Sequence, residues 1–217
     1  MDRNTVIEAI EKHKIIVILR GLTRDQLINT AEAMYKGGIR LAEVTYDSLG
    51  NPSDEETAAN IRALAEAFPG MHIGAGTVLT ERQAELTAEA GGKFIISPDT
   101  NPDVIRRTRE LGLVSIPGSL TPSEATLAHR SGADFIKLFP NGEMKPSYLH
   151  AVAVPLSHLK FLAVGGVNEN NLADYIRAGA CGIGVATGIV NKEKIKAGDY
   201  AAITALARKY VAAAESL

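Results

Sequence analysis

The sequence has very few of the residues that cross-link small folds through disulfides or that bind metals. Its 217 residues include one cysteine, Cys181, and no tryptophan, and its five histidines are scattered without metal-ligand spacing. A single cysteine excludes an internal disulfide framework and a cysteine-rich metal site, so we expect no metal and a reducing, cytoplasmic setting. A chain of this length can bury roughly 70% of its unfolded surface, which is enough for one core without such cross-links or metals.

Long apolar runs and an excess of one charge are also missing. No stretch of about 18 apolar residues occurs, which argues against a membrane-spanning helix. The charged residues 1–14 lack the apolar segment of a secretory signal and are predicted to form a short N-terminal helix. The 23 basic and 25 acidic residues give a formal net charge of -2, so the broad positive surface that nucleic acids require is absent. We therefore expect neither a membrane nor a nucleic acid as partner.

What the sequence does contain is a repeated strand and helix pattern. Runs of β-branched and apolar residues recur along the whole chain, as in IIVILR from residue 15, FIKLFP from residue 135 and FLAVGG from residue 161. Helix-like stretches lie between them, with apolar residues three and four positions apart. Glycine follows many of these stretches, as in YKGGIR and RAGACG, where it would turn the chain back to the sheet.

The number of these modules predicts the fold class. About eight modules without an internal linker indicate an α/β fold, a single-domain (β/α)₈ TIM barrel over residues 1–217. An open doubly wound sheet is the alternative. Its G-x-G-x-x-G fingerprint is missing from the first turn, ILRGLTRDQ, so we favour the barrel.

Three ionisable residues lie within or at the end of the apolar strands. Arg20 ends IIVILR, Glu43 lies within LAEVTY and Lys137 lies within FIKLFP. Counting by twos places each in the series that faces the barrel interior, near the strand ends where barrel enzymes carry their chemistry. Burial among apolar neighbours should lower the proton affinity of Lys137. A neutral amine is the nucleophile that attacks a ketone or aldehyde to form a Schiff base.

Each of these residues has a second interpretation. Lys137 and Glu43 could instead form a structural ion pair inside the barrel, whereas a carboxyl tuned by its surroundings would serve as a general acid/base. Arg20 offers a planar guanidinium suited to a substrate carboxylate, or it bridges two loops at the rim. The sequence alone leaves both choices open.

Three glycine-containing segments are candidates for close contact with a substrate. In GAGTVL, Gly74 and Gly76 allow a close approach of the backbone to a ligand, although tight barrel packing explains them equally well. The segments AVGGV and GVATG follow two late strands, where barrel enzymes often bind phosphate through backbone N–H groups. Neither segment has a nearby arginine or lysine, so such a site would depend on backbone dipoles and the Thr187 hydroxyl.

Several of these segments together resemble one known family. They are VILRG, GGIRLAEVT, IGAGTVL, FIISP, FIKLFP, VGGVN and the PG-x-x-TPSE segment that begins at Pro117. In this order and at these separations, the chain from about Ile15 to Tyr210 resembles the KDPG/KHG aldolases, class I aldolases that cleave 2-keto-3-deoxy-6-phospho sugar acids. The resemblance implies a (β/α)₈ barrel, commonly a homotrimer, that releases pyruvate and glyceraldehyde 3-phosphate. A lysine is the electron sink in such enzymes, so the resemblance implies no cofactor.

The resemblance also implies roles for individual residues. Lys137 falls on the family's Schiff-base lysine and Glu43 on its general acid/base, and Arg20 matches a carboxylate-binding arginine found in part of the family. The remaining implied substrate contacts are Thr77, Pro98, Phe139, Gly165, Gly166, Ala186 and Thr187.

The chain departs from the family pattern at three places. Val164 stands before the paired glycines where many KDPG-type members have threonine, a pattern more like the branch that acts on the galactonate epimer. Asp47 replaces an arginine found in some members and would disfavour a highly anionic substrate. Ala186 and Thr187 stand where Gly-Ser is frequent. Alternative functions are therefore an aldolase for an unphosphorylated acid such as 4-hydroxy-2-oxoglutarate, a phosphate-binding barrel isomerase or epimerase, and a non-catalytic sugar-acid sensor.

Overall fold

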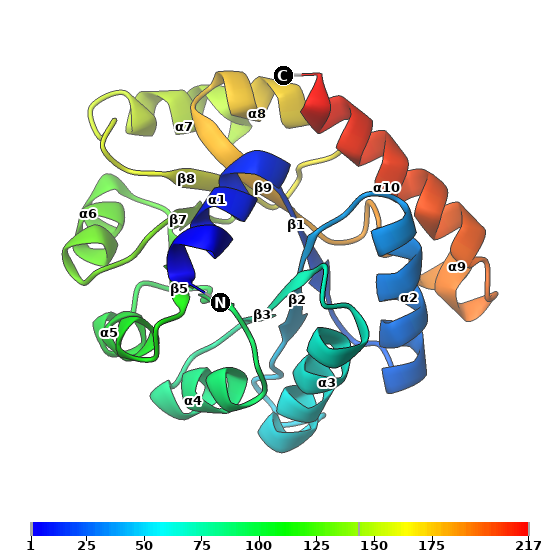
Figure 1. Ribbon diagram of the computed structural model, residues 1–217. Helices are drawn as coiled ribbons and strands as arrows, with labels where there is room; N and C mark the ends of the chain where they lie inside the picture. Colours follow the sequence, from blue (N-terminus) through cyan, green and yellow to red (C-terminus); the bar gives the residue numbers. More distant parts are fainter. Residues whose placement is uncertain (1, 143, 217) are drawn as a thin grey trace.

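A computed structural model describes residues 2–142 and 144–216, in which strands and helices alternate (Figure 1). The strands are β1 (Ile15–Leu19), β2 (Leu41–Thr45), β3 (His72–Gly76), β4 (Phe94–Ile96), β5 (Val114–Ile116), β6 (Gly118–Ser119), β7 (Ile136–Leu138), β8 (Phe161–Val164) and β9 (Ala180–Val185). The helices are α1 (Arg3–His13), α2 (Arg24–Lys36), α3 (Asp54–Ala67), α4 (Glu81–Glu89), α5 (Pro102–Glu110), α6 (Pro122–Arg130), α7 (Lys145–Ala153), α8 (Leu172–Arg177), α9 (Lys192–Lys196) and α10 (Tyr200–Glu215). No helix in the described ranges is both long and apolar enough to cross a membrane.

The strands form one parallel sheet that curls into a nearly closed barrel. Their order is β5-β4-β3-β2-β1-β9-β8-β7-β6, so β5 and β6 lie at the two ends of the sheet. Only Pro117 separates these two strands along the chain, and its carbonyl accepts a hydrogen bond of 2.9 Å from the Lys137 amide. The run LVSIPG, residues 113–118, is therefore divided at Pro117, because proline has no N–H to continue the ladder. The sheet has nine strands in place of the expected eight.

The N-terminal helix closes one end of the barrel. In Figure 1, α1 lies across the ring of strands while the other helices surround it. Val6 and Ile10 of α1 are buried in an apolar cluster with barrel side chains such as Phe94 and Phe135. The Asp134 carboxylate accepts hydrogen bonds from Arg3 and Arg109, which ties α1 to α5 at this end. The carboxyl ends of the strands lie at the opposite end of the barrel, which α1 does not cover.

Candidate active site

The carboxyl ends of the strands surround a cavity of about 550 Å³. Every residue to which the family resemblance gives a role lines this one cavity, whereas Gly74 and Gly76 do not. The residues with such a role are Arg20, Glu43, Thr77, Pro98, Lys137, Phe139, Gly165, Gly166, Ala186 and Thr187. They come from segments far apart in the sequence, and the parallel order of the strands brings them together because all strands end on the same face.

Lys137 is the central residue of β7, and its amine is buried. Its side chain is 7% exposed, and its Nζ lies 4.6 Å from the centre of the Phe139 ring. Burial lowers the pKa of Lys137, and the positive charge of Arg20 lowers it further, while the negative charge of Glu43 opposes both. The desolvation prevails, so the amine loses its proton more easily than an exposed lysine does.

Glu43 faces the same interior from β2. It is 2% exposed, and its Oε2 atom has no hydrogen-bond partner among the described residues. Burial raises the pKa of Glu43 to about 7, against the opposing charges of Lys137 and Arg20. The two groups influence each other's pKa, but no direct ion pair joins Lys137 to Glu43 in the described part of the chain. A carboxyl that titrates near neutral pH is suited to moving protons in both directions.

The glycines of β3 make room for these side chains. A Cβ atom on Gly76 would lie 2.4 Å from Glu43 Oε1, so glycine at this position leaves space for the carboxyl group. A Cβ atom on Gly74 would lie 2.4 Å from a carbon of the Phe94 ring. Both glycines therefore make room for side chains of the barrel interior, and a close approach of a substrate to GAGTVL stays a prediction.

Arg20 and Thr77 form a polar pair at the mouth of the cavity. Strand β1 ends at Leu19, so Arg20 is one residue beyond the strand that it was expected to end, and it is exposed. Its guanidinium donates a hydrogen bond of 2.7 Å to Thr77 Oγ1. Thr77 has a φ of 58°, which is unusual for a β-branched residue and indicates that its surroundings hold it in place.

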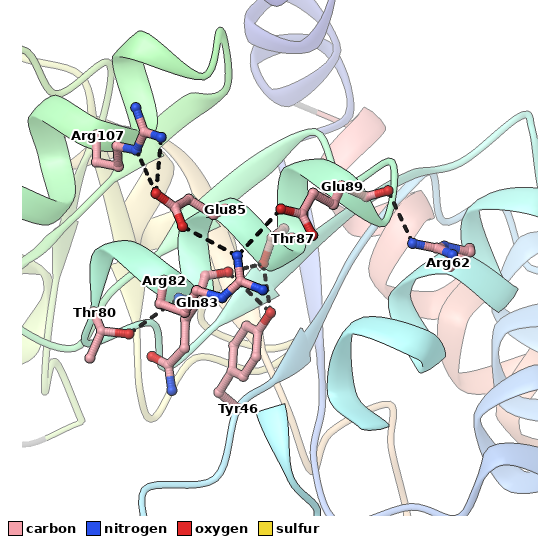
Figure 2. A network of polar contacts seen from close by, with 9 residues as sticks. All are labelled: Tyr46, Arg62, Thr80, Arg82, Gln83, Glu85, Thr87, Glu89 and Arg107. Atoms are coloured by element: carbon pink, nitrogen blue, oxygen red, sulfur yellow. Dashed lines mark hydrogen bonds and ion pairs between the residues drawn. The ribbon is translucent and has the colours of Figure 1, made fainter. Parts of the chain in front are cut away.

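Contacts from α4 hold the loop that carries Thr77. Gln83 is 6% exposed, and its Oε1 accepts a hydrogen bond of 2.8 Å from the Leu79 amide. Its Nε2 donates to Asp54 at the start of α3, 3.0 Å away. Tyr46, just beyond β2, donates from its hydroxyl to the Gln83 carbonyl over 3.1 Å (Figure 2). The Gln83 side chain thus connects the loop beyond β3 with α3, and the Gln83 carbonyl accepts the contact from the residue beyond β2.

The part of the cavity that follows β8 and β9, which we call its far end, is formed mainly by backbone atoms. Gly165 and Gly166 have φ angles of 95° and 68°, which non-glycine residues rarely adopt. A Cβ atom on Gly166 would come within 2.4 Å of the Gly142 Cα, so the two segments pack backbone against backbone. Beyond β9, the amides of Thr187 and Gly188 donate no hydrogen bond within the described residues. Amides left free in this way can bind an anion such as phosphate.

Several residues that line the cavity were not among the substrate contacts expected from the sequence. Ile18 and Val164 are apolar strand residues whose inward direction follows from the same alternation that placed Glu43. Tyr210 could not be found in this way, because it comes from α10, more than twenty residues beyond the nearest strand of the site. The described residues contain no cluster of three histidine, cysteine or acidic side chains that could hold a metal ion.

Comparison with protein families gives one match that spans most of the chain. Residues 6–206 match the sequence pattern of the family described as KDPG and KHG aldolase. A relative from Rhizobium meliloti (strain 1021), named a probable 2-dehydro-3-deoxy-6-phosphogalactonate aldolase, is 38% identical over 186 residues. The alignment covers 85% of each chain.

Solved structures give the same result. A structure described as native KDPGal matches with a TM-score of 0.83 and 32% identity, covering 93% of this chain and 94% of the other. A KDPG aldolase from Legionella pneumophila, solved with pyruvate captured as a covalent carbinolamine intermediate, matches with a TM-score of 0.82 and 28% identity. That match covers 92% of this chain and 95% of the Legionella chain.

Proposed function

This chain belongs to the KDPG and KHG aldolase family, and from that premise we propose that it cleaves a 2-keto-3-deoxy-6-phospho sugar acid to pyruvate and glyceraldehyde 3-phosphate. The relatives are aldolases, which are carbon–carbon lyases. The observation that carries the proposal is a desolvated lysine, Lys137, in the same cavity as an unpaired carboxyl, Glu43, at the carboxyl ends of the strands. The galactonate epimer is favoured, since the relative from Rhizobium meliloti carries that name.

In the proposed reaction, Lys137 acts as the nucleophile. The neutral amine adds to the C2 ketone of the substrate to give a carbinolamine, and loss of water, with one proton taken from solvent, then gives a protonated imine. Glu43, as carboxylate, takes the proton of the C4 hydroxyl. The C3–C4 electron pair moves into the iminium as the bond breaks, so the aldehyde leaves and a pyruvate enamine remains on Lys137.

Glu43 then completes the cycle as an acid. It returns its proton to C3 of the enamine, which restores the protonated imine, and water hydrolyses this imine to pyruvate and neutral Lys137 while one proton returns to solvent. A pKa of about 7 suits a group that must accept a proton in one step and give it back in another. The fully buried position of Glu43 is the physical cause of that pKa.

The other lining residues are assigned to the two ends of the substrate. Arg20 and Thr77 bind its carboxylate, and Pro98 and Phe139 form the wall beside Lys137. At the far end, backbone groups take the phosphate. They belong to Gly165, Gly166, Ala186 and Thr187. The positive φ angles of the two glycines and the free amide of Thr187 support this assignment.

Two finer features of the assembly belong to the same proposal. Strands β5 and β6 act as one strand interrupted at Pro117, which makes the chain a single (β/α)₈ barrel domain over residues 1–217, with α1 as its cap. Their separation by one residue and their places at the two ends of the sheet support this count. On its resemblance to the family, the protein forms a homotrimer.

A second candidate substrate class is an unphosphorylated 2-keto acid such as 4-hydroxy-2-oxoglutarate. Asp47 favours this class. Its acidic side chain lines a side cavity of about 140 Å³ together with Arg20 and Thr77. A negative charge near the mouth lowers the local affinity for highly anionic substrates. A barrel isomerase or epimerase would use the same carboxyl but would not form a covalent bond to lysine.

A substrate panel tests the proposal. We expect pyruvate release, measured in a coupled lactate dehydrogenase assay, to be fastest for a phosphorylated 2-keto-3-deoxy acid and slower for 4-hydroxy-2-oxoglutarate. Incubation with pyruvate and borohydride should add mass to the peptide that contains Lys137, whereas an isomerase or epimerase would not be trapped in this way. The absence of both pyruvate release and trapping would refute an aldolase.

We expect Gln83→Leu to weaken substrate binding without touching the cavity. Loss of the Leu79 and Asp54 contacts should loosen the loop that holds Thr77, so KM for the keto acid rises about fivefold while kcat changes less than about twofold. Thr87→Val is the matched control. It removes the 3.0 Å contact between Thr87 and the Tyr46 hydroxyl but leaves the Gln83 side chain in place. Equal changes of KM in both variants would contradict a specific role of Gln83.

A further inference from the structure

A buried hydroxyl group lies at the far end of the cavity without a partner. Tyr210 of α10 lines the cavity, and its side chain is fully buried. Its Oη atom has no hydrogen-bond partner among the described residues. A buried polar group in this condition destabilises a fold, and native proteins seldom keep one without a reason.

The position of the hydroxyl places it directly beneath the turn that follows β9. A Cβ atom on Gly188 would lie 1.9 Å from Tyr210 Oη, so the hydroxyl occupies the space that a side chain at residue 188 would fill. The nearest atom of β9 to that space is a methyl group of Val185. The hydroxyl therefore adjoins the same turn as the free amides of Thr187 and Gly188.

A second buried tyrosine shows what an ordinary structural hydroxyl does in this fold. Tyr175 of α8 is 3% exposed, and its hydroxyl donates a hydrogen bond of 3.3 Å to the Asn141 carbonyl. It does not line the cavity. The two tyrosines thus differ in both respects, since only the one at the cavity lacks a partner.

Tyr210 remains a hydrogen-bond donor throughout the neutral pH range. Burial, followed by the negative charge of nearby Glu169, raises the pKa of Tyr210 to about 12. The Glu169 carboxylate lies beside this hydroxyl and contributes to the raised pKa of Tyr210, but the contact lacks the geometry of a hydrogen bond. The cationic side chains among the lining residues are Arg20 and Lys137, and the proposed reaction uses both at the keto-acid end. A phosphate at the far end would therefore meet neutral side-chain donors, among them the Tyr210 and Thr187 hydroxyls, close to the backbone amides.

From this arrangement we infer that Tyr210 is a specificity-determining residue for the distal phosphate. Its hydroxyl donates a hydrogen bond to an oxygen of the phosphate that the turn at Thr187 and Gly188 binds. This inference rests on the proposed function and adds to it a side-chain contact that favours phosphorylated over unphosphorylated substrates. The hydroxyl also explains why glycine stands at residue 188.

The test is Tyr210→Phe, which removes only the hydroxyl. We expect the ratio of kcat/KM for the phosphorylated acid to that for 4-hydroxy-2-oxoglutarate to fall about tenfold, the size expected for one hydrogen bond to a charged acceptor. The inhibition constant of inorganic phosphate should rise by a similar factor. The Tm should stay level or rise, because the variant no longer buries an unpartnered hydroxyl.

Tyr175→Phe is the control, since it should lower the Tm without changing the selectivity ratio. The inference is overturned if Tyr210→Phe keeps the wild-type ratio and phosphate inhibition, or if it lowers the Tm and slows both substrates equally, as a purely structural hydroxyl would. Calorimetric binding of inorganic phosphate to the wild type and to Tyr210→Phe separates this inference from the proposed reaction. If Lys137 traps no pyruvate, the reaction assignment fails, while weaker phosphate binding by the variant still supports the role of Tyr210.

Discussion

Replacing Lys137 by methionine should reduce aldol cleavage by about 10⁴-fold or more, because the variant has no amine to form the imine. Methionine fills a similar apolar space, so we expect the fold to persist. The same variant should no longer gain mass from pyruvate and borohydride. Both effects are measured on purified protein, by pyruvate release and by mass spectrometry of the intact chain.

Lys160→Met is the matched control for this variant. Lys160 also lies over a barrel phenylalanine, with its Nζ 5.6 Å from the centre of the Phe135 ring, and it pairs with Glu11. It precedes β8, at the end of the barrel opposite the cavity. Its loss should leave cleavage and trapping within about twofold of the wild type. Substantial activity in Lys137→Met would disprove the assignment of the nucleophile.

Replacing Glu43 by glutamine should reduce kcat by about 10²- to 10⁴-fold, the usual range for a positioned general acid/base. Glutamine keeps the shape of the side chain in the space above Gly76 but can neither take nor return a proton. Imine formation at Lys137 needs no carboxyl for its covalent step. The variant should therefore still be trapped by pyruvate and borohydride, and loss of trapping would show that Glu43 mainly supports the lysine.

The pH dependence of both proteins gives a further readout of the Glu43 assignment. With a pKa of about 7 in the free wild type, the carboxylate that accepts the C4 hydroxyl proton is lost below neutral pH, so kcat/KM should rise as pH increases through about 7. Glu43→Gln should lack this inflection. An unchanged inflection near pH 7 in the variant would assign the titration to another group.

The ionisation of Glu43 should make the wild type less stable as pH rises, whereas it makes the wild type more active. The folded state holds the Glu43 proton up to about pH 7, while the unfolded chain releases it near 4.5. The wild type therefore loses stability relative to Glu43→Gln as pH rises from 4.5 to about 7. In thermal unfolding, the Tm of Glu43→Gln relative to the Tm of the wild type should be higher at pH 8 than at pH 5. The raised pKa of a buried carboxyl thus favours catalysis and reduces stability.

The residues of the cavity could be predicted because strands alternate with a period of two. That period alone placed Glu43 and Lys137 on the inner side of their strands, and parallel order then brought them to one face. Two of the glycine segments were found from their place at strand ends, since Gly165 follows β8 and Ala186 follows β9, whereas Gly74 and Gly76 lie within β3. The same rule extended the first strand to Arg20, whereas β1 ends one residue earlier and leaves this side chain exposed at the mouth.

Local sequence determined the module order, the inward residues and the glycines that allow close approach, because these depend on neighbours within a few positions along the chain. Only the tertiary structure decided the division of the sheet at Pro117, the support that Gln83 gives to the Thr77 loop and the arrival of Tyr210 at the far end of the cavity. These features depend on contacts between segments far apart in sequence. The pKa values of Glu43 and Lys137 belong with them, since the closed barrel, rather than the adjoining residues, removes water from both groups.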